Sequence, residues 1–191
     1  MDSMAEQFFS SRGIKLNMAT EHIQECVSPG RYPQFKELLA SVRRGAEVRT
    51  HSAEVQPGDV FVALSGTRTD GSRFIPQAVA RQAAWIVHSW HIQPQVQPGV
   101  HFFPCADVGL VLGHLAAARY KTREMKPFVI GITGTNGKTT ISYLVEHLLH
   151  HAGMRCGVLG TINYRWSGIE RQADLTTPGC LDIHAMLAAM V

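Results

Sequence analysis

The segment that decides the fold is Phe128-Val129-Ile130-Gly131-Ile132-Thr133-Gly134-Thr135-Asn136-Gly137-Lys138-Thr139-Thr140. Its first five residues are apolar or glycine, which is typical of a strand buried on both faces. After the glycine-rich turn, apolar residues recur at helical spacing until Gly153, where a helix is expected to end. A buried strand, a glycine-rich turn and an amphipathic helix, in that order, indicate an α/β domain that binds a nucleotide at the turn.

The turn has the residue types that polyphosphate binding needs. Glycines let the backbone wrap closely around phosphates with N–H groups pointing inward, and the helix N-terminus adds partial positive charge. Lys138 is expected to reach the β- and γ-phosphates, and the Thr139 hydroxyl to ligate Mg²⁺. The strict G-x-x-x-x-G-K-[ST] spacing fails at one position, because Ile132 stands where its first glycine belongs. The predicted ATP-binding residues are Gly134, Thr135, Asn136, Gly137, Lys138, Thr139 and Thr140, with Lys138 catalytic and Thr139 the metal ligand.

Strands and helices alternate upstream of this segment. Val60-Phe61-Val62-Ala63-Leu64 is a continuous apolar run, typical of a strand inside a parallel sheet. Further strands are expected at 85–87 and 100–103, and helices from Pro33 to Gly45, over 74–83 and from Val108 onward. This alternation predicts an α/β domain.

A polar, basic joint at 121–127 separates a second unit from the first. We expect two domains, residues 1–126 (with 1–44 weakly defined) and residues 127–191. In the second we expect a strand at 156–159, mostly loop over 160–175, and a helix from Thr177-Pro178 to the end. Two strands and two helices make only the incomplete start of a P-loop, Rossmann-like domain.

Composition excludes several classes of protein. The 191 residues are 45% hydrophobic and 17% charged, which is enough apolar material for a core and excludes a wholly disordered chain. Lys and Arg (18) exceed Asp and Glu (15) by only 3, without a dense basic run, so no nucleic-acid partner is expected. Apolar stretches are too short for a membrane span, which needs about 20 residues, and no signal peptide is expected.

Cysteine and histidine usage also excludes classes of protein, namely those held together by disulfides or by a metal ion. The four cysteines are Cys26, Cys105, Cys156 and Cys180. Because they are scattered without a C-x-x-C pair, we predict free thiols and a cytoplasmic protein. The pairs His88/His91 and His150/His151 have no companion cluster of Cys, Asp or Glu at ligand spacing, so no metal site is predicted at either.

With Thr133 included, the glycine-rich turn resembles the phosphate loop of the Mur ligase family, the ATP-dependent amide-bond-forming enzymes of peptidoglycan biosynthesis. Residues 57–64, followed by Gly66 and Asp70-Gly71, resemble the N-terminal substrate domain of its MurE and MurF branches. Residues 157–162 and 175–178 resemble the MurE-like branch, which adds the third residue of the stem peptide. The resemblance covers roughly residues 45–191.

The resemblance implies the N-terminal portion of a ligase that acts on UDP-N-acetylmuramoyl-L-Ala-D-Glu through an acyl phosphate, with ATP and Mg²⁺ as cofactors. Residues 1–126 would then be the UDP-muramoyl-substrate-binding domain and 127–191 the partial ATP-binding domain. The residues implied in substrate binding are Ser52, Thr67, Arg68, Thr69, Thr176 and Thr177. Two positions depart from the family pattern: His51-Ser52-Ala53 stands where many members have Asp-Ser-Arg, and Leu175 where some have Asn.

The family's acidic Mg²⁺ ligand, its histidine partner, its modified lysine and the domain for the incoming amino acid lie beyond the Thr-Thr-Pro segment. We therefore expect the 191-residue chain alone not to ligate. Two alternatives stay open: a non-catalytic nucleotide or UDP-sugar binding module, and a small P-loop kinase or GTPase. The second would need a later strand ending in Asp as Mg²⁺ anchor, whereas the strand at 156–159 ends at Gly160.

Overall fold

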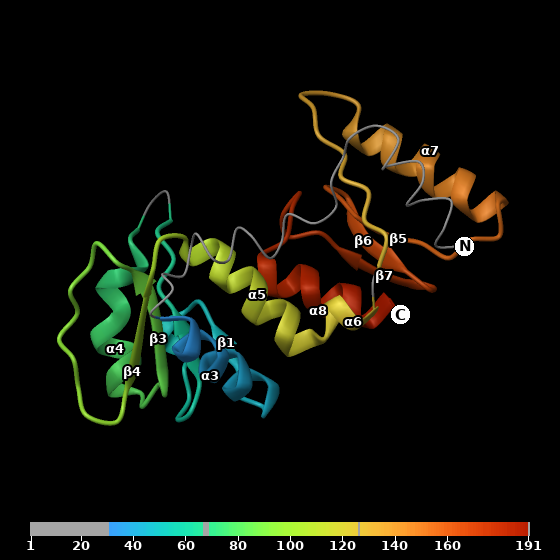
Figure 1. Ribbon diagram of the computed structural model, residues 1–191. Helices are drawn as coiled ribbons and strands as arrows, with labels where there is room; N and C mark the ends of the chain where they lie inside the picture. The colour runs from blue at the N-terminus through green and yellow to red at the C-terminus, as the bar shows by residue number, and fades with distance from the viewer. Residues whose placement is uncertain (1–30, 67–68, 126, 191) are drawn as a thin grey trace, which may run out of the picture. The chain divides into compact units, whose positions relative to one another are not determined.

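The computed structural model describes residues 31–66, 69–125 and 127–190 (Figure 1). The chain divides into two compact units, one up to Leu115 and the other from Ala116. The division falls inside helix α5 (Val108–Tyr120). Each unit combines helices with a sheet, so the predicted α/β class is confirmed. Cys26, Thr67 and Arg68 lie outside the described residues.

The first unit contains a four-stranded parallel sheet whose strands lie in chain order, β1-β2-β3-β4. The strands are β1 (Val48–Arg49), β2 (Val60–Val62), β3 (Trp85–Ser89) and β4 (His101–Cys105). Val60 is paired with Val48 on one side and with Trp85 on the other, so β2 is an inner strand. Its three residues are all buried, as the continuous apolar run predicts. The two-residue β1 is too short to have a sequence pattern, and the sequence analysis does not predict it.

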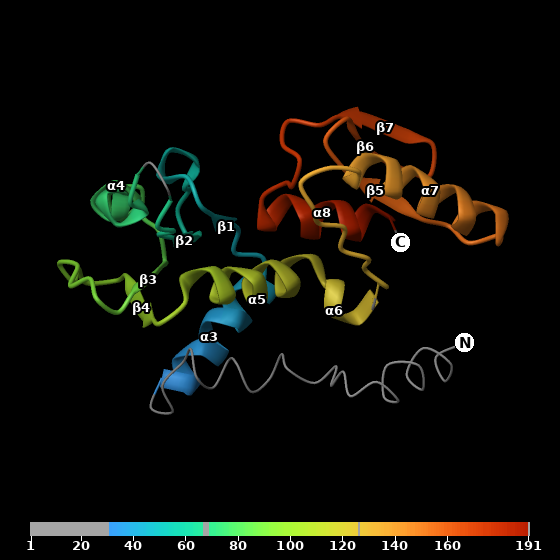
Figure 2. The ribbon, with the colours of Figure 1, turned by 90° about the horizontal axis from the view of Figure 1, so that it is seen from above.

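Helices cover both faces of this sheet (Figure 2). On one face, Ile75 and Ala78 of α4 (Ile75–Ala80) pack with Phe61 and Ile86. On the other face, the Phe35 ring of α3 (Tyr32–Arg43) lies 5.7 Å from the ring of Phe103, centroid to centroid. Burial on both sides explains why β2 and the first three residues of β3 are apolar.

Two short 3₁₀ helices, η2 (Ser52–Glu54) and η3 (Gly71–Phe74), lie in the connections on either side of β2. The helix predicted over 74–83 is therefore shorter than expected. Its beginning belongs to η3, and α4 is followed by Gln82, whose φ of 62° is incompatible with a right-handed helix. The predicted helix from Pro33 ends as expected just before Gly45, which has a φ of 116°.

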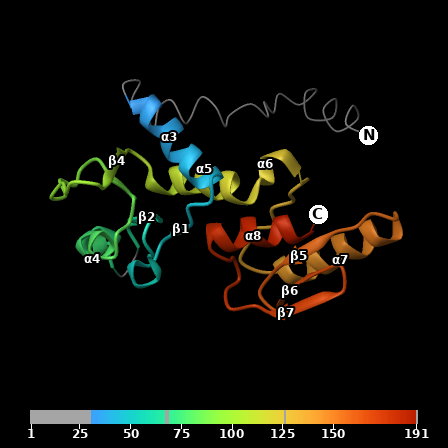
Figure 3. The ribbon, with the colours of Figure 1, turned by 90° about the horizontal axis from the view of Figure 1, so that it is seen from below.

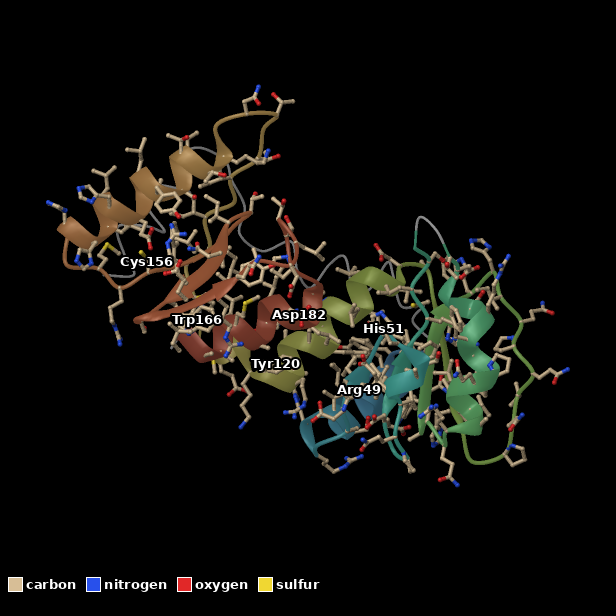
Figure 4. All side chains as sticks on the ribbon, turned by 180° about the vertical axis from the view of Figure 1, so that it is seen from behind. Arg49, His51, Tyr120, Cys156, Trp166 and Asp182 are labelled. Carbon is tan, nitrogen blue, oxygen red and sulfur yellow. The ribbon has the colours of Figure 1, made fainter. Side chains whose placement is uncertain are left out.

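The second unit is built around a three-stranded antiparallel sheet in the order β5-β6-β7. The elements after α5 are α6 (Thr122–Met125), α7 (Lys138–His151), β5 (Gly157–Leu159), β6 (Asn163–Trp166), β7 (Ile169–Gln172) and α8 (Cys180–Met190). Tyr164 and Trp166 pack against Met186 of α8. Trp166 is labelled on the sheet in Figure 4. Arg165 alternates with them along β6 and contacts α7 instead, so the sheet lies between α8 and α7 (Figure 1; Figure 3 gives the view from below).

Two sequence predictions for this unit are wrong. The strand expected at 128–132 is absent, since residues 127–134 form no helix or strand, and Phe128 and Val129 are 71% and 67% exposed. A strand exists only through hydrogen bonds to a neighbouring strand. The sheet of this unit is formed by β5, β6 and β7 alone. The apolar run that suits a buried strand is consequently left exposed.

The region 160–175, expected to be mostly loop, contains the hairpin of β6 and β7. Ser167 and Gly168 form its two-residue turn, with φ of 46° and 81°. Positive φ at both turn positions matches the right-handed twist of the flanking strands. A Ser-Gly pair between two four-residue segments is the sequence signal that predicts such a turn.

Candidate phosphate-binding site

The glycine-rich turn leads directly into the N-terminus of α7. Gly137 is the residue before the helix and has a left-handed φ of 79°. A Cβ added there would meet no atom within 4 Å, so it is the backbone conformation and not crowding that requires glycine. The Gly137 carbonyl accepts the Ile141 N–H at 2.9 Å, which is the first hydrogen bond of the helix. Glycine provides no side chain to cap the first-turn N–H groups, and these groups suit an anion.

Lys138 extends back over the turn. Its Nζ donates a hydrogen bond to the Gly134 carbonyl at 2.5 Å. This contact closes a loop whose two ends are the glycines with positive φ, Gly134 at 149° and Gly137 at 79°. The ammonium group is therefore held beside the backbone that the sequence predicts to surround phosphates.

The other predicted ATP-binding residues lie along the same turn. Thr135, Asn136 and Thr140 are exposed, and Thr139 is half-buried in the first turn of α7. The Thr139 carbonyl accepts the Ser142 hydroxyl at 2.7 Å. The hydroxyl of a threonine is a hard oxygen donor of the kind that Mg²⁺ prefers. The seven predicted residues are consecutive in the sequence, and they form the turn and the beginning of α7.

Thr176 and Thr177 lie on an exposed segment between β7 and α8. The helix begins at Cys180, so the two threonines precede it and do not occupy its first turn. Two contacts attach this segment to the sheet. The Tyr164 hydroxyl donates to the Leu175 carbonyl at 2.6 Å, and the Thr161 hydroxyl lies 3.4 Å from that of Thr176.

The predicted substrate residues of the first unit are in different surroundings. Ser52 is buried, and its hydroxyl donates to Oε1 of Gln77 at 2.8 Å. Thr69 is exposed, and its carbonyl accepts the Gly66 N–H at 3.0 Å. Asp70 accepts the Ser72 N–H at 3.0 Å, a hydrogen bond that lowers the pKa of its carboxyl group.

Gly71 fixes the end of the same loop. A Cβ at this position would lie 2.4 Å from the backbone oxygen of Leu64. The Gly71 N–H donates to that oxygen at 2.8 Å, so the close approach of the two backbones is itself a hydrogen bond. Glycine is therefore required at position 71 for a steric reason that the sequence alone does not reveal.

Comparison with known proteins identifies two consecutive domains. Residues 46–120 match the family described as Mur ligase family, catalytic domain, and residues 132–191 match the Mur ligase middle domain. The chain belongs to the Mur ligase family. The membership covers both units, including the parallel sheet of the first and the glycine-rich turn of the second.

Curated Mur ligases similar to this chain share one name. The UDP-N-acetylmuramoyl-L-alanyl-D-glutamate–2,6-diaminopimelate ligase of Lawsonia intracellularis is 50% identical over 139 residues, which are 73% of this chain and 29% of that protein. The ligase of the same name from Gloeobacter violaceus is 44% identical over 146 residues, 76% of this chain and 29% of that protein. The chain therefore spans less than a third of the length of these relatives.

Among solved structures, the MurF ligase of Thermotoga maritima in complex with ADP is 28% identical, with a TM-score of 0.42. The match covers 58% of this chain and 24% of that one.

Within the described part of this Mur ligase chain, no helix is long and apolar enough to cross a membrane.

Sequence reasoning about this Mur ligase chain missed the residues that connect α7 to the sheet. Arg165 forms a two-pronged ion pair with Glu146 of α7, with N–O distances of 2.5 to 3.0 Å. Its guanidinium also lies 3.9 Å from the ring centroid of Tyr143. The hydrogen bond with Glu146 raises the pKa of Arg165. Because the partners are 19 and 22 residues apart in the sequence, no local pattern predicts the contact.

Proposed function

We propose that this chain provides the substrate-binding and phosphate-binding portions of an ATP-dependent ligase that adds the third amino acid to UDP-N-acetylmuramoyl-L-Ala-D-Glu. The observation that carries the proposal is the Lys138 ammonium held beside the glycine-rich turn at the N-terminus of α7. The names of the curated relatives support the substrate and the reaction class. Membership of the Mur ligase family favours this proposal over a small P-loop kinase or GTPase.

In the proposed reaction, the substrate's terminal carboxylate attacks the γ-phosphate of ATP, which breaks the bond to the bridging oxygen, releases ADP and gives an acyl phosphate. The amine of the incoming amino acid then displaces inorganic phosphate from the acyl phosphate and loses a proton, which forms the amide. Lys138 would exchange its contact with the Gly134 carbonyl for the phosphates and neutralise the charge that develops on the transferring group. The turn's N–H groups would orient the phosphate chain. Positioning and charge neutralisation are the main contributions of protein to phosphoryl transfer.

Mg²⁺ fits this site through one protein oxygen. The Thr139 hydroxyl in the first turn of α7 is a neutral oxygen donor, and Mg²⁺ keeps several waters and phosphate oxygens as its other ligands. When bound, the ion would offset charge on the phosphate oxygens. Gly137 has no Cβ, so no side chain at this position takes up space beside the turn.

For the substrate, we propose that Thr176 and Thr177 contact the UDP-muramoyl group from the second unit. Their segment is held to the sheet through Tyr164 and Thr161, which supports a fixed position for the hydroxyls. In the first unit we propose Ser52 and the loop of Thr67, Arg68 and Thr69. The Ser52 hydroxyl already donates to Gln77, so it would have to exchange this partner to contact the substrate. A cytoplasmic setting suits the thiols of Cys156 and Cys180, which form no disulfide.

Calorimetric titration with ATP and Mg²⁺ tests the phosphate site. We expect the Lys138→Ala chain to bind at least about tenfold more weakly than wild type, because a hydrogen bond to a charged group is lost. Lys36→Ala is the matched control, since Lys36 is an exposed lysine of α3 in the first unit. Equal affinity of wild type and Lys138→Ala would show that the turn is not the phosphate site.

A ligation assay tests the role of the chain. With UDP-N-acetylmuramoyl-L-Ala-D-Glu, ATP and diaminopimelate or lysine, we expect no amino-acid-dependent release of ADP from the 191-residue protein. The resemblance to the family puts the acidic Mg²⁺ ligand and the amino-acid-binding domain beyond residues 176–178. Measurable turnover would overturn this expectation while leaving the phosphate site intact.

A further inference from the structure

Two histidines lie side by side at the C-terminal end of α7. The ring centroids of His147 and His151 lie 4.4 Å apart, and the ring planes are tilted by 46° relative to each other. Both side chains are exposed, and residues four apart lie on the same side of a helix. The adjacent pair His150/His151, considered in the sequence, is not the pair whose rings meet.

We propose that His147 and His151 form a two-imidazole binding site for a divalent transition-metal ion such as Zn²⁺, Ni²⁺ or Cu²⁺. Neutral imidazole is a good ligand for these ions, and two histidines at positions i and i+4 of one helix place both nitrogens on one face. Zinc binds histidine nitrogen at about 2.0–2.1 Å, so two such nitrogens lie roughly 3.3 Å apart in tetrahedral geometry. Rings with centroids 4.4 Å apart reach this spacing by small side-chain rotations.

The position on the helix also favours a cation. His151 is the last residue of α7, where the unpaired carbonyl groups concentrate partial negative charge. Within the described residues, no group of three or more His, Cys, Asp or Glu side chains is placed to hold a metal ion. The site therefore provides two protein ligands, and water fills the other positions. Such an open site binds reversibly and exchanges readily with buffer.

This ion is distinct from the Mg²⁺ proposed for the nucleotide. The phosphate loop lies at the N-terminus of α7 and the histidines at its C-terminus, and a helix of 14 residues is about 21 Å long. Mg²⁺ prefers oxygen ligands and the histidine pair offers only nitrogen. Failure of the ATP titration would leave this proposal untouched, and the reverse also holds.

Titration of the full 191-residue chain with Zn²⁺ or Ni²⁺ tests the site. The chain has 10 histidines, so the comparison among three matched variants matters more than binding itself. We expect His147→Gln and His151→Gln each to weaken the tightest binding at least about tenfold, since each removes one of two ligands. His150→Gln, also in the last turn of α7, is expected to bind like wild type, and Mg²⁺ is expected not to bind the pair.

A spectroscopic measurement separates ligation from a change in the helix. With one equivalent of Cu²⁺, we expect an electron paramagnetic resonance spectrum with two equatorial nitrogens in wild type and one in either His147→Gln or His151→Gln. Far-ultraviolet circular dichroism should show equal helix content in all variants, because the replaced side chains are exposed. Equal loss of affinity in all three variants, no loss in any, or loss with His150→Gln alone would overturn the proposal.

Discussion

The two units of this Mur ligase chain bury their apolar residues to very different degrees. In the first, the sheet is covered on both faces, and Phe61, Ile86 and Phe103 have no measurable exposure. In the described part of the second, the hydrophobic cluster around the sheet has three buried residues, Tyr164, Trp166 and Met186. Helix α7 has no buried residue at all, although it is amphipathic like α3. An amphipathic pattern therefore indicates which face of a helix is apolar, but not whether anything covers it.

The largest expected effect is the difference in the free energy of unfolding between removing an apolar side chain from the first unit and removing one from the second. Phe61→Ala removes a fully buried ring and should lower the free energy of unfolding by about 3–5 kcal/mol. Leu144→Ala on α7 removes a side chain that is 58% exposed, and should change it by less than about 0.5 kcal/mol. Urea denaturation followed by circular dichroism measures both. A comparable loss in the two variants would mean that α7 is covered in solution.

A smaller effect is expected at the ion pair that attaches α7 to its sheet. Arg165 and Glu146 keep 15% and 26% of their side-chain surface, so water screens the pair only in part. We expect a coupling energy of about 1–2 kcal/mol from a double-mutant cycle of Arg165→Met and Glu146→Gln. The exposed Arg155 provides the control substitution Arg155→Met. A coupling energy near zero would show that this ion pair does not stabilise the contact between α7 and the hairpin.

The smallest effect is a pH dependence of the second unit. Burial, with the nearby charge of Arg123, lowers the pKa of His184, whose Nδ1 lies 2.6 Å from the Thr122 hydroxyl. An unfolded histidine has a pKa of about 6.5, so below that pH the unfolded chain takes up a proton that the folded chain resists. The stabilisation is therefore present above about pH 6.5 and is lost as pH falls toward the folded pKa.

Hydrogen exchange of the α8 amides at pH 7.5 and 5.5, corrected for intrinsic rates, measures this loss. His184→Gln should make the protection of α8 less dependent on pH. Burial also lowers the pKa of His88 in the first unit, so the β3 amides provide an internal comparison. If the protection of α8 does not change with pH in wild type, the role given to His184 is wrong.

Local patterns predicted the elements that depend on neighbouring residues alone. The run at 60–64, the helix before Gly45 and the helix between Lys138 and Gly153 all have their signals within one segment. The glycine-rich turn is of the same kind, because positive φ at Gly134 and Gly137 is a local requirement. The turn at 167–168 depends on an equally local signal, the Ser-Gly pair, although a loop is expected there.

What the sequence by itself determined about this protein is its α/β class, its family and the position of the glycine-rich turn for which we propose phosphate binding, since each depends on residue type at short spacing. Only the tertiary structure decided which apolar segments are buried, because burial needs a partner that lies far along the chain. It left residues 128–132 without a strand, joined Arg165 to Glu146, and brought the rings of His147 and His151 together. Strand pairing and ion pairs between elements are determined by the fold, whereas turn geometry and helix periodicity are determined by the local chain.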